Sequence, residues 1–70
     1  MSSWRATYTD GLEASVDPNT AGTLWYVDVD HLDMETGIYT NYKAVRYCRQ
    51  DAVSLAVVLK DMIRKTLTAR

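Results

Sequence analysis

The stretch from Asp51 to Leu67 constrains the fold of this chain more than any other. It contains no Gly or Pro, and its apolar residues recur at helical spacing. These residues are Ala52, Leu55, Ala56, Leu59, Met62, Ile63 and Leu67, and the opposite side carries Lys60, Asp61, Arg64 and Lys65. An amphipathic helix of this kind buries one face against another element. We therefore predict a helix that covers one face of the structure formed by the preceding residues, with Asp51 as its N-cap or one turn further in.

The length and composition fit a single globular domain spanning residues 1–70. Such a chain is near the lower size limit for one hydrophobic core. Its hydrophobic content of 47% and charged content of 24% argue against disorder. No apolar run approaches the ~18 residues of a membrane span, and no apolar signal segment follows Met1. We expect a cytoplasmic protein that does not enter the membrane.

Two stretches of alternating polarity, residues 4–9 and 12–16, predict a β-hairpin near the start of the chain. A two-residue loop would place their apolar residues on opposite faces. A three-residue loop that ends at Gly11 pairs Tyr8 with Leu12 and brings the apolar residues together, with Gly11 in the left-handed conformation. Because a one-residue slip would expose a whole apolar set, we predict the three-residue loop.

Residues 24–32 and 38–47 predict a second hairpin, joined by a four-residue loop that ends at Gly37. One face of this ladder pairs Val29 with Tyr42, Val27 with Ala44 and Trp25 with Arg46. The other face pairs Leu32 with Tyr39, Asp30 with Asn41, Asp28 with Lys43, Tyr26 with Val45 and Leu24 with Tyr47. Apolar residues then meet apolar residues and an acid meets a base, which stabilises an antiparallel sheet. A helix that begins near Thr40 is the alternative.

The predicted fold class is therefore α+β. Four antiparallel strands in two hairpins form one sheet, and the C-terminal helix packs on one face to give two layers. The residues expected under the helix are Trp4, Tyr8, Leu12, Val16, Trp25, Val27, Val29, Tyr42 and Ala44.

This arrangement leaves apolar side chains uncovered on the other face of the sheet and on the charged side of the helix. They are Leu24, Tyr26, Leu32, Tyr39, Val45 and Tyr47 on the sheet, and Val53 and Val57 on the helix. A monomer rarely exposes a contiguous apolar patch of more than a few hundred Å². Either the N-terminal residues or the twist of the sheet covers these groups, or they form an interface. The simplest interface is that of a homodimer, which we expect here.

The chemistry of the chain does not predict an enzyme. His31 is the only histidine and Cys48 the only cysteine, and the predicted register places them at opposite ends of the second hairpin. We expect Cys48 to be a small buried residue. The acidic segment 28–35 lacks the glycine and final glutamate of a calcium loop, one cysteine makes no thiolate zinc site, and no glycine-rich phosphate loop is present. We predict no metal and no cofactor.

Charge is distributed unevenly along the chain. Residues 1–37 carry one basic and seven acidic side chains, whereas residues 38–70 carry seven basic and two acidic ones. The simplest interpretation is that the two halves neutralise one another in the fold. The alternative is an acidic surface for a basic partner, formed by a hairpin that carries Asp28, Asp30, Asp33 and Glu35.

In its small size, acidity and lack of cysteine pairs, the chain resembles inhibitors encoded by phages and mobile elements, including anti-CRISPR proteins. This resemblance rests on size and charge, not on a motif. It implies a non-enzymatic protein-binding module whose acidic hairpin occupies a basic nucleic-acid-binding surface of a defence complex in the host cytoplasm. The alternative is a nucleic-acid-binding or regulatory module that uses Lys43, Arg46 and Arg49, although a pI near 5.6 disfavours strong phosphate binding.

Overall fold

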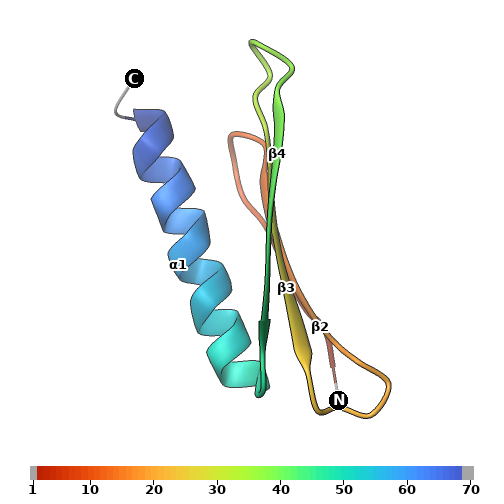
Figure 1. Cartoon of the computed structure of the whole chain (residues 1–70). Helices are drawn as coiled ribbons and strands as arrows, with labels where there is room; N and C mark the ends of the chain where they lie inside the picture. The colour runs from red at the N-terminus through yellow and green to blue at the C-terminus, as the bar shows by residue number, and fades with distance from the viewer. Residues whose placement is uncertain (1, 69–70) are drawn as a thin grey trace.

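Four antiparallel strands form one sheet, and one helix packs against it in the computed structural model, which describes residues 2–68 (Figure 1). The elements are β1 (Trp4–Thr7), β2 (Leu12–Pro18), β3 (Trp25–Leu32), β4 (Tyr39–Arg46) and α1 (Arg49–Thr68). The strand order β1-β2-β3-β4 pairs each strand with its neighbours in the chain. The predicted α+β class and the two-hairpin sheet are confirmed. We call the side of the sheet under α1 the inner face and the other side the open face.

The first hairpin has the predicted three-residue loop. The Tyr8 amide donates to the Leu12 carbonyl at 2.8 Å, and Ala6 stands opposite Ala14. Gly11 has the expected positive φ, at 73°, and the φ of Asp10 is also positive, at 67°. This register places the apolar residues of both strands on the inner face, as burial requires.

Asn19 organises the connection between β2 and β3. Its backbone amide donates to the Leu24 carbonyl at 2.9 Å, and its side-chain oxygen accepts from the amides of Thr23 and Leu24 at 2.9 and 3.1 Å. An Asn side chain that binds nearby backbone in this way replaces the hydrogen bonds that a strand would supply. The strand therefore starts at Trp25, one residue later than predicted.

The second hairpin has the predicted loop and register. The Asp33 amide donates to the Ile38 carbonyl at 2.9 Å, and Gly37 has a φ of 74°. The ladder runs from Trp25 opposite Arg46 to Leu32 opposite Tyr39, with every intermediate pair as expected. The predicted pair of Leu24 and Tyr47 lies outside this ladder, and the alternative of a helix from Thr40 is wrong.

The core lies between α1 and the inner face, over the two central strands. Its fully or nearly fully buried residues are Leu12, Ala14, Val16, Trp25, Val27, Val29, Ala52 and Ala56. Both helical members of this group are alanines, so the helix backbone lies close to the sheet. Such close packing leaves little room for larger side chains at these two positions.

The helix begins two residues before Asp51, because Arg49 and Gln50 form its first turn. The Ala52 amide donates to the Cys48 carbonyl at 3.1 Å. Asp51 therefore lies inside the first turn, near the positive end of the helix dipole, which is the second of the two predicted places. Cys48 is exposed at this junction and not buried as expected.

The helix is rotated about its axis relative to the prediction. Val53 packs against the core and Val57 is half-buried, so the flank that carries them is not exposed as predicted. Lys60 and Arg64 share this flank and lie over the Tyr8 ring, with their charged ends 4.8 and 5.6 Å from its centre. Their aliphatic stems thus cover apolar surface while the charges stay near water.

The opposite flank of α1 is correspondingly more open than predicted. Met62 is exposed, although its spacing placed it on the buried side, and Val58 is exposed one turn earlier. Tyr42 on β4 lies on the inner face as predicted, yet it is exposed too. The reason is that α1 packs mainly over β2 and β3 and leaves the edge of β4 partly uncovered.

Candidate functional site on the open face of the sheet

The open face has a polar middle and two apolar ends. Cross-strand neighbours form two polar rows, one of Arg5, Ser15, Asp28 and Lys43 and one of Thr7, Glu13, Asp30 and Asn41. Tyr26 and Val45 follow the first row, and Leu32 and Tyr39 follow the second. Asp28 and Asp30 therefore lie at the centre of a face bordered by apolar side chains at both ends.

Asp28 and Asp30 form a close pair, bridged by an amide. The Asn41 side chain donates one hydrogen bond to Asp28 and another to Asp30. Both acids are half-buried. Lys43 stands 3.8 Å from Asp28 but is largely exposed, so this contact contributes little to stability. We call Asp28 and Asp30 the acid pair.

The two carboxyl groups of the acid pair have opposite pKa shifts. Partial burial raises the pKa of Asp28, and its hydrogen bond with Asp30 raises it further, against the effects of Asn41 and Lys43. Burial also acts to raise the pKa of Asp30, but hydrogen bonds with Asp28, Tyr39 and Asn41 outweigh it and lower the pKa. The hydrogen bond with Asp30 in turn raises the pKa of the Tyr39 hydroxyl. Asp30 is thus the stronger acid, and Asp28 holds its proton more readily.

Three shallow hollows surround the acid pair. One, of about 160 Å³, lies toward β1 and β2 and is bordered by both acids. A second, of about 350 Å³, lies between Asp28 and the Tyr26–Val45 end, and a third, of about 280 Å³, lies between Asp30 and the Leu32–Tyr39 end. Each hollow is lined by at least one carboxylate and by other side chains of the sheet.

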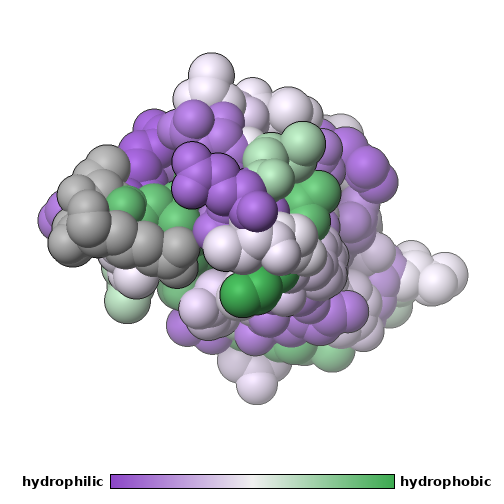
Figure 2. All heavy atoms as spheres, turned by 90° about the horizontal axis from the view of Figure 1, so that it is seen from above, coloured by the Kyte–Doolittle hydropathy of each residue, from purple (hydrophilic) through white to green (hydrophobic). Residues whose placement is uncertain are grey.

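The predicted apolar residues of the open face are largely where the sequence placed them. Exposed residues are Tyr26, Leu32, Tyr39, Val45 and Tyr47, whereas Leu24 is half-buried beside Asn19. Met34 and Ile38 are exposed near the tip of the second hairpin. Viewed from that end, hydrophobic side chains reach the surface between hydrophilic ones (Figure 2). The sheet thus carries apolar surface at both ends of its polar middle.

The other two acidic residues of the predicted binding hairpin do not join the acid pair. The Asp33 side chain accepts from the amides of Glu35 and Thr36 at 3.0 and 3.4 Å and so shapes the turn. Glu35 is exposed in the turn itself. The structure therefore separates the four predicted residues into a pair on the sheet and two residues in the loop.

The three basic residues of the nucleic-acid alternative lie apart. Lys43 projects from the open face beside Asp28, whereas Arg46 belongs to the inner-face register and donates to the Val45 carbonyl at 2.7 Å. Arg49, in the first turn of α1, donates to the Ser2 carbonyl at 3.2 Å. They do not form one basic surface.

His31 and Cys48, the two residues considered for catalysis, lie far apart in the fold. His31 is buried on the inner face, between Leu12 and Thr40 on the neighbouring strands. Cys48 lies at the start of α1, beyond the other end of the second hairpin. Within residues 2–68, no three His, Cys, Asp or Glu side chains gather where they could hold a metal ion.

Sequence reasoning missed Glu13 as a member of the site. It stands directly opposite Asp30 and adds a third carboxylate to the polar middle. The register between β2 and β3 places it there, and the long connection around Asn19 sets that register. The pairing of Asp30 with Asn41 did follow from the sequence, but the reach of Asn41 across to Asp28 depends on side-chain geometry.

The comparisons with known proteins found no match to this chain, whether with protein-family models, with curated proteins or with solved structures. Across the part of the chain that the structure describes, no helix combines the length and apolar character needed to cross a membrane.

Proposed function

We propose that this protein is a non-enzymatic protein-binding module that recognises a basic segment of a partner protein on its open face. The observation that carries the proposal is the position of the acid pair, half-buried among hollows and bordered by exposed aromatic and aliphatic side chains. Exposed tyrosines are typical of protein interfaces, and the acidic centre adds selectivity for a basic partner.

An arginine or lysine side chain suits this centre. A guanidinium group matches carboxylate geometry with paired hydrogen bonds, and its stem can lie on a neighbouring ring. Tyr26 and Tyr39 stand at the two ends of the polar rows, within the same face as the acids. The acidic groups would therefore select a cation and the tyrosines would supply contact area.

A protein of this kind would act as an inhibitor when its partner uses the same basic segment to hold nucleic acid. The acid pair and Glu13 would take the place of phosphates there, as in the phage-encoded inhibitors that the chain resembles in size and charge. Complementary charge speeds such association, and its effect declines as salt is added. We therefore expect nucleic acid and this protein to compete for the partner.

The test is binding of a labelled arginine-rich peptide, followed by fluorescence anisotropy at low and moderate salt. The double variant Asp28→Asn/Asp30→Asn keeps the shape of both side chains and removes their charge. We expect it to bind at least about 10-fold more weakly than the unaltered protein, a loss of about 1.4 kcal/mol. Far-UV circular dichroism checks that the variant is folded.

The matched control is Asp10→Asn/Asp61→Asn, which changes the net charge equally at exposed positions outside the open face. Asn is well tolerated at the positive φ of residue 10. We expect this control to bind the peptide as the unaltered protein does. Equal losses in the two double variants would contradict the proposal, since they would assign binding to net charge alone. A gel shift with mixed DNA and RNA tests the nucleic-acid alternative, for which the dispersed basic residues give no support.

A further inference from the structure

The free edge of β4 differs from the other edge of the sheet. β4 extends over eight residues, Tyr39–Arg46, whereas the opposite edge strand, β1, has four. The β4 ladder with β3 is continuous, and β4 contains no proline. A long regular edge presents unpaired backbone groups that can join another strand. The length and regularity of this edge do not depend on the acid pair.

The backbone groups that face this edge can be identified from the register. Antiparallel ladders alternate between hydrogen-bonded and non-hydrogen-bonded pairs. Since the Asp33 amide donates to the Ile38 carbonyl, the even-numbered residues of β4 direct their amides and carbonyls toward β3. The odd-numbered residues Tyr39, Asn41, Lys43 and Val45 therefore direct theirs outward. One of these groups, the Val45 carbonyl, accepts a hydrogen bond from the Arg46 side chain at 2.7 Å, which pairing with another strand would replace.

We propose that the β4 edge binds a second copy of this chain. The two β4 strands would pair in antiparallel fashion about a twofold axis at Tyr42, so that one sheet continues through both copies. Asn41 then faces the partner's Lys43, and Tyr39 faces the partner's Val45. All four outward-facing residues form hydrogen-bonded pairs, and each opposite pair lies on the same face of the sheet.

Charge favours this register over its neighbours. An axis at Lys43 would place two lysines face to face, which is destabilising. An axis at Asn41 would leave Val45 without a partner residue on β4. With the axis at Tyr42, Lys43 lies in a row between its own Asp28 and the partner's Asn41 and Asp30. Each copy thus brings a cation to the acidic row of the other.

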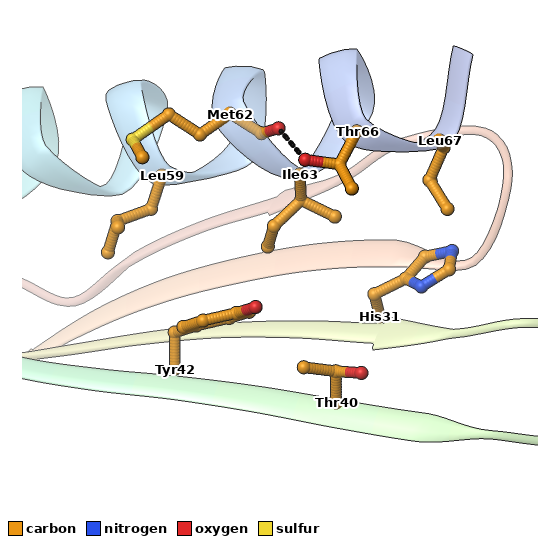
Figure 3. Close-up of a pocket in the computed structure, with 8 residues that line it drawn as sticks. All are labelled: His31, Thr40, Tyr42, Leu59, Met62, Ile63, Thr66 and Leu67. Carbon is orange, nitrogen blue, oxygen red and sulfur yellow. Dashed lines mark hydrogen bonds between the residues drawn. The ribbon is translucent and has the colours of Figure 1, made fainter. Parts of the chain in front are cut away.

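The inner side of the same edge is apolar and incompletely covered. Tyr42, Val58 and Met62 are 45%, 52% and 59% exposed. A cavity of about 170 Å³ lies between the C-terminal half of α1 and the ends of β3 and β4, with Tyr42 and Met62 in its lining (Figure 3). α1 leans away from the sheet toward this end (Figure 1).

Self-pairing of β4 would cover this apolar edge. The two Tyr42 residues would form a non-hydrogen-bonded pair, the type in which opposite side chains approach most closely. Val58 and Met62 lie one turn apart on the flank of α1 beside β4, so they would border the paired rings. The same contact would therefore pair the backbone groups of the edge, place Lys43 beside carboxylates of both copies and cover the exposed apolar side chains.

The first test is the solution mass of the full chain by light scattering, from about 1 µM to about 1 mM, a range that spans tight and weak dimers. We expect twice the 7.9 kDa of one chain. Lys43→Pro removes an outward amide donor without removing a bond to β3, and we expect it to be a folded monomer. Lys43→Ala loses the same charge but keeps the amide and should remain a dimer.

The second test examines the register by oxidative cross-linking in a Cys48→Ser background. Tyr42→Cys places two thiols opposite one another at the axis, so we expect a covalent dimer. Thr40→Cys faces the partner's Ala44 and should cross-link only when mixed with Ala44→Cys. A monomeric unaltered protein, a dimeric Lys43→Pro variant, or self-linking of Thr40→Cys in place of Tyr42→Cys would each overturn the proposal. The first of these outcomes would leave the edge for a strand of a different protein.

Discussion

Gly11 lies where the first loop meets β3, and no other residue type fits there. Its φ is 73°, and a Cβ atom built on it would stand 2.3 Å from the Leu32 carbonyl oxygen. That oxygen belongs to backbone whose amide donates to the Gly11 carbonyl at 3.1 Å, so it cannot move away without breaking this contact. Gly37 has the same conformation, with a φ of 74°, but open space around it.

Substitutions at these two glycines measure the cost of a left-handed backbone conformation apart from the cost of a steric clash. We expect Gly37→Ala to lower the free energy of unfolding by about 1 kcal/mol, the cost of a left-handed L-residue. Gly11→Ala should lower it by at least about 3 kcal/mol, because a backbone clash adds to that cost. Urea denaturation of both variants measures the difference. Equal losses would show that the loop moves away from Leu32 at little cost.

The acid pair gives stability a specific dependence on pH. Because the pKa of Asp28 is raised in the folded state, the folded protein binds this proton more readily than the unfolded chain does. Stability therefore falls as pH rises above the usual Asp range through the raised pKa. Asp28→Asn removes this loss and should be more stable than the unaltered protein at pH 7 by roughly 0.5 kcal/mol, the size of a charge effect on a sheet surface. Thermal unfolding at several pH values should show the gain disappearing in acid.

Asp61 supplies the control of opposite sign. Its hydrogen bond with Lys60, at 2.6 Å, lowers its pKa, so its contribution is present above the usual Asp range and lost as pH falls through the lowered value. Asp61→Asn should therefore be the less stable protein at pH 7 and should equal the unaltered protein in strong acid. If both substitutions changed the stability at pH 7 in the same direction, the opposite pKa shifts of Asp28 and Asp61 would be contradicted.

At the scale of the elements, the closest contact is that of α1 with the two central strands. Ala52 and Ala56 are fully buried, so the helix has no space for longer side chains there. We expect Ala56→Leu to lower the free energy of unfolding by about 1–3 kcal/mol through overpacking. Ser54→Leu adds the same side chain on the exposed side of α1 and should change stability by less than about 0.5 kcal/mol. Chemical denaturation distinguishes them, and equal effects would place the helix further from the sheet.

Strands and their registers could be predicted because the turns and the alternation of polarity agree. A shift of one residue at Tyr8 opposite Leu12, or at Asp28 opposite Lys43, would have exposed an apolar set or separated an acid from a base. The acid pair followed from the same reasoning, since Asp28 and Asp30 alternate onto one face. Local pattern was sufficient within each of the two hairpins, where a short turn joins the paired strands.

The rotation of α1 could not be predicted in the same way. Its apolar and charged residues define a stripe, but Lys60 and Arg64 have long stems that pack over Tyr8 as apolar residues do. Pattern alone counts such residues as solvent-facing, and so it placed Val53 outside and Met62 inside. The position of Glu13 beside Asp30 escaped prediction because the Asn19 connection fixes that pairing through side-chain hydrogen bonds.

At the scale of the whole molecule, a single hydrophobic core lies between the sheet and α1. Val27 is buried between the sheet and α1, and Trp25 lies beside it on the same strand. We expect tryptophan fluorescence and far-UV circular dichroism to report the same unfolding transition. Val27→Ala should lower both midpoints together, at a cost of about 2 kcal/mol, whereas Val45→Ala on the open face should cost less than about 0.5 kcal/mol. Separate transitions for the two signals would show that the sheet persists without the helix.

The meander order of the strands has a consequence for how fast the protein folds. Every strand pairs with its neighbour in the chain, so each pairing closes a short loop and loses little chain entropy. The contacts of α1 with β2 and with Tyr8 join parts of the chain that are far apart in sequence. We therefore expect strand pairing and helix formation to be early and reversible, and the docking of α1 across the sheet to set the folding rate. Until that step the inner face meets water, and the interval before docking is when the chain is most exposed to aggregation.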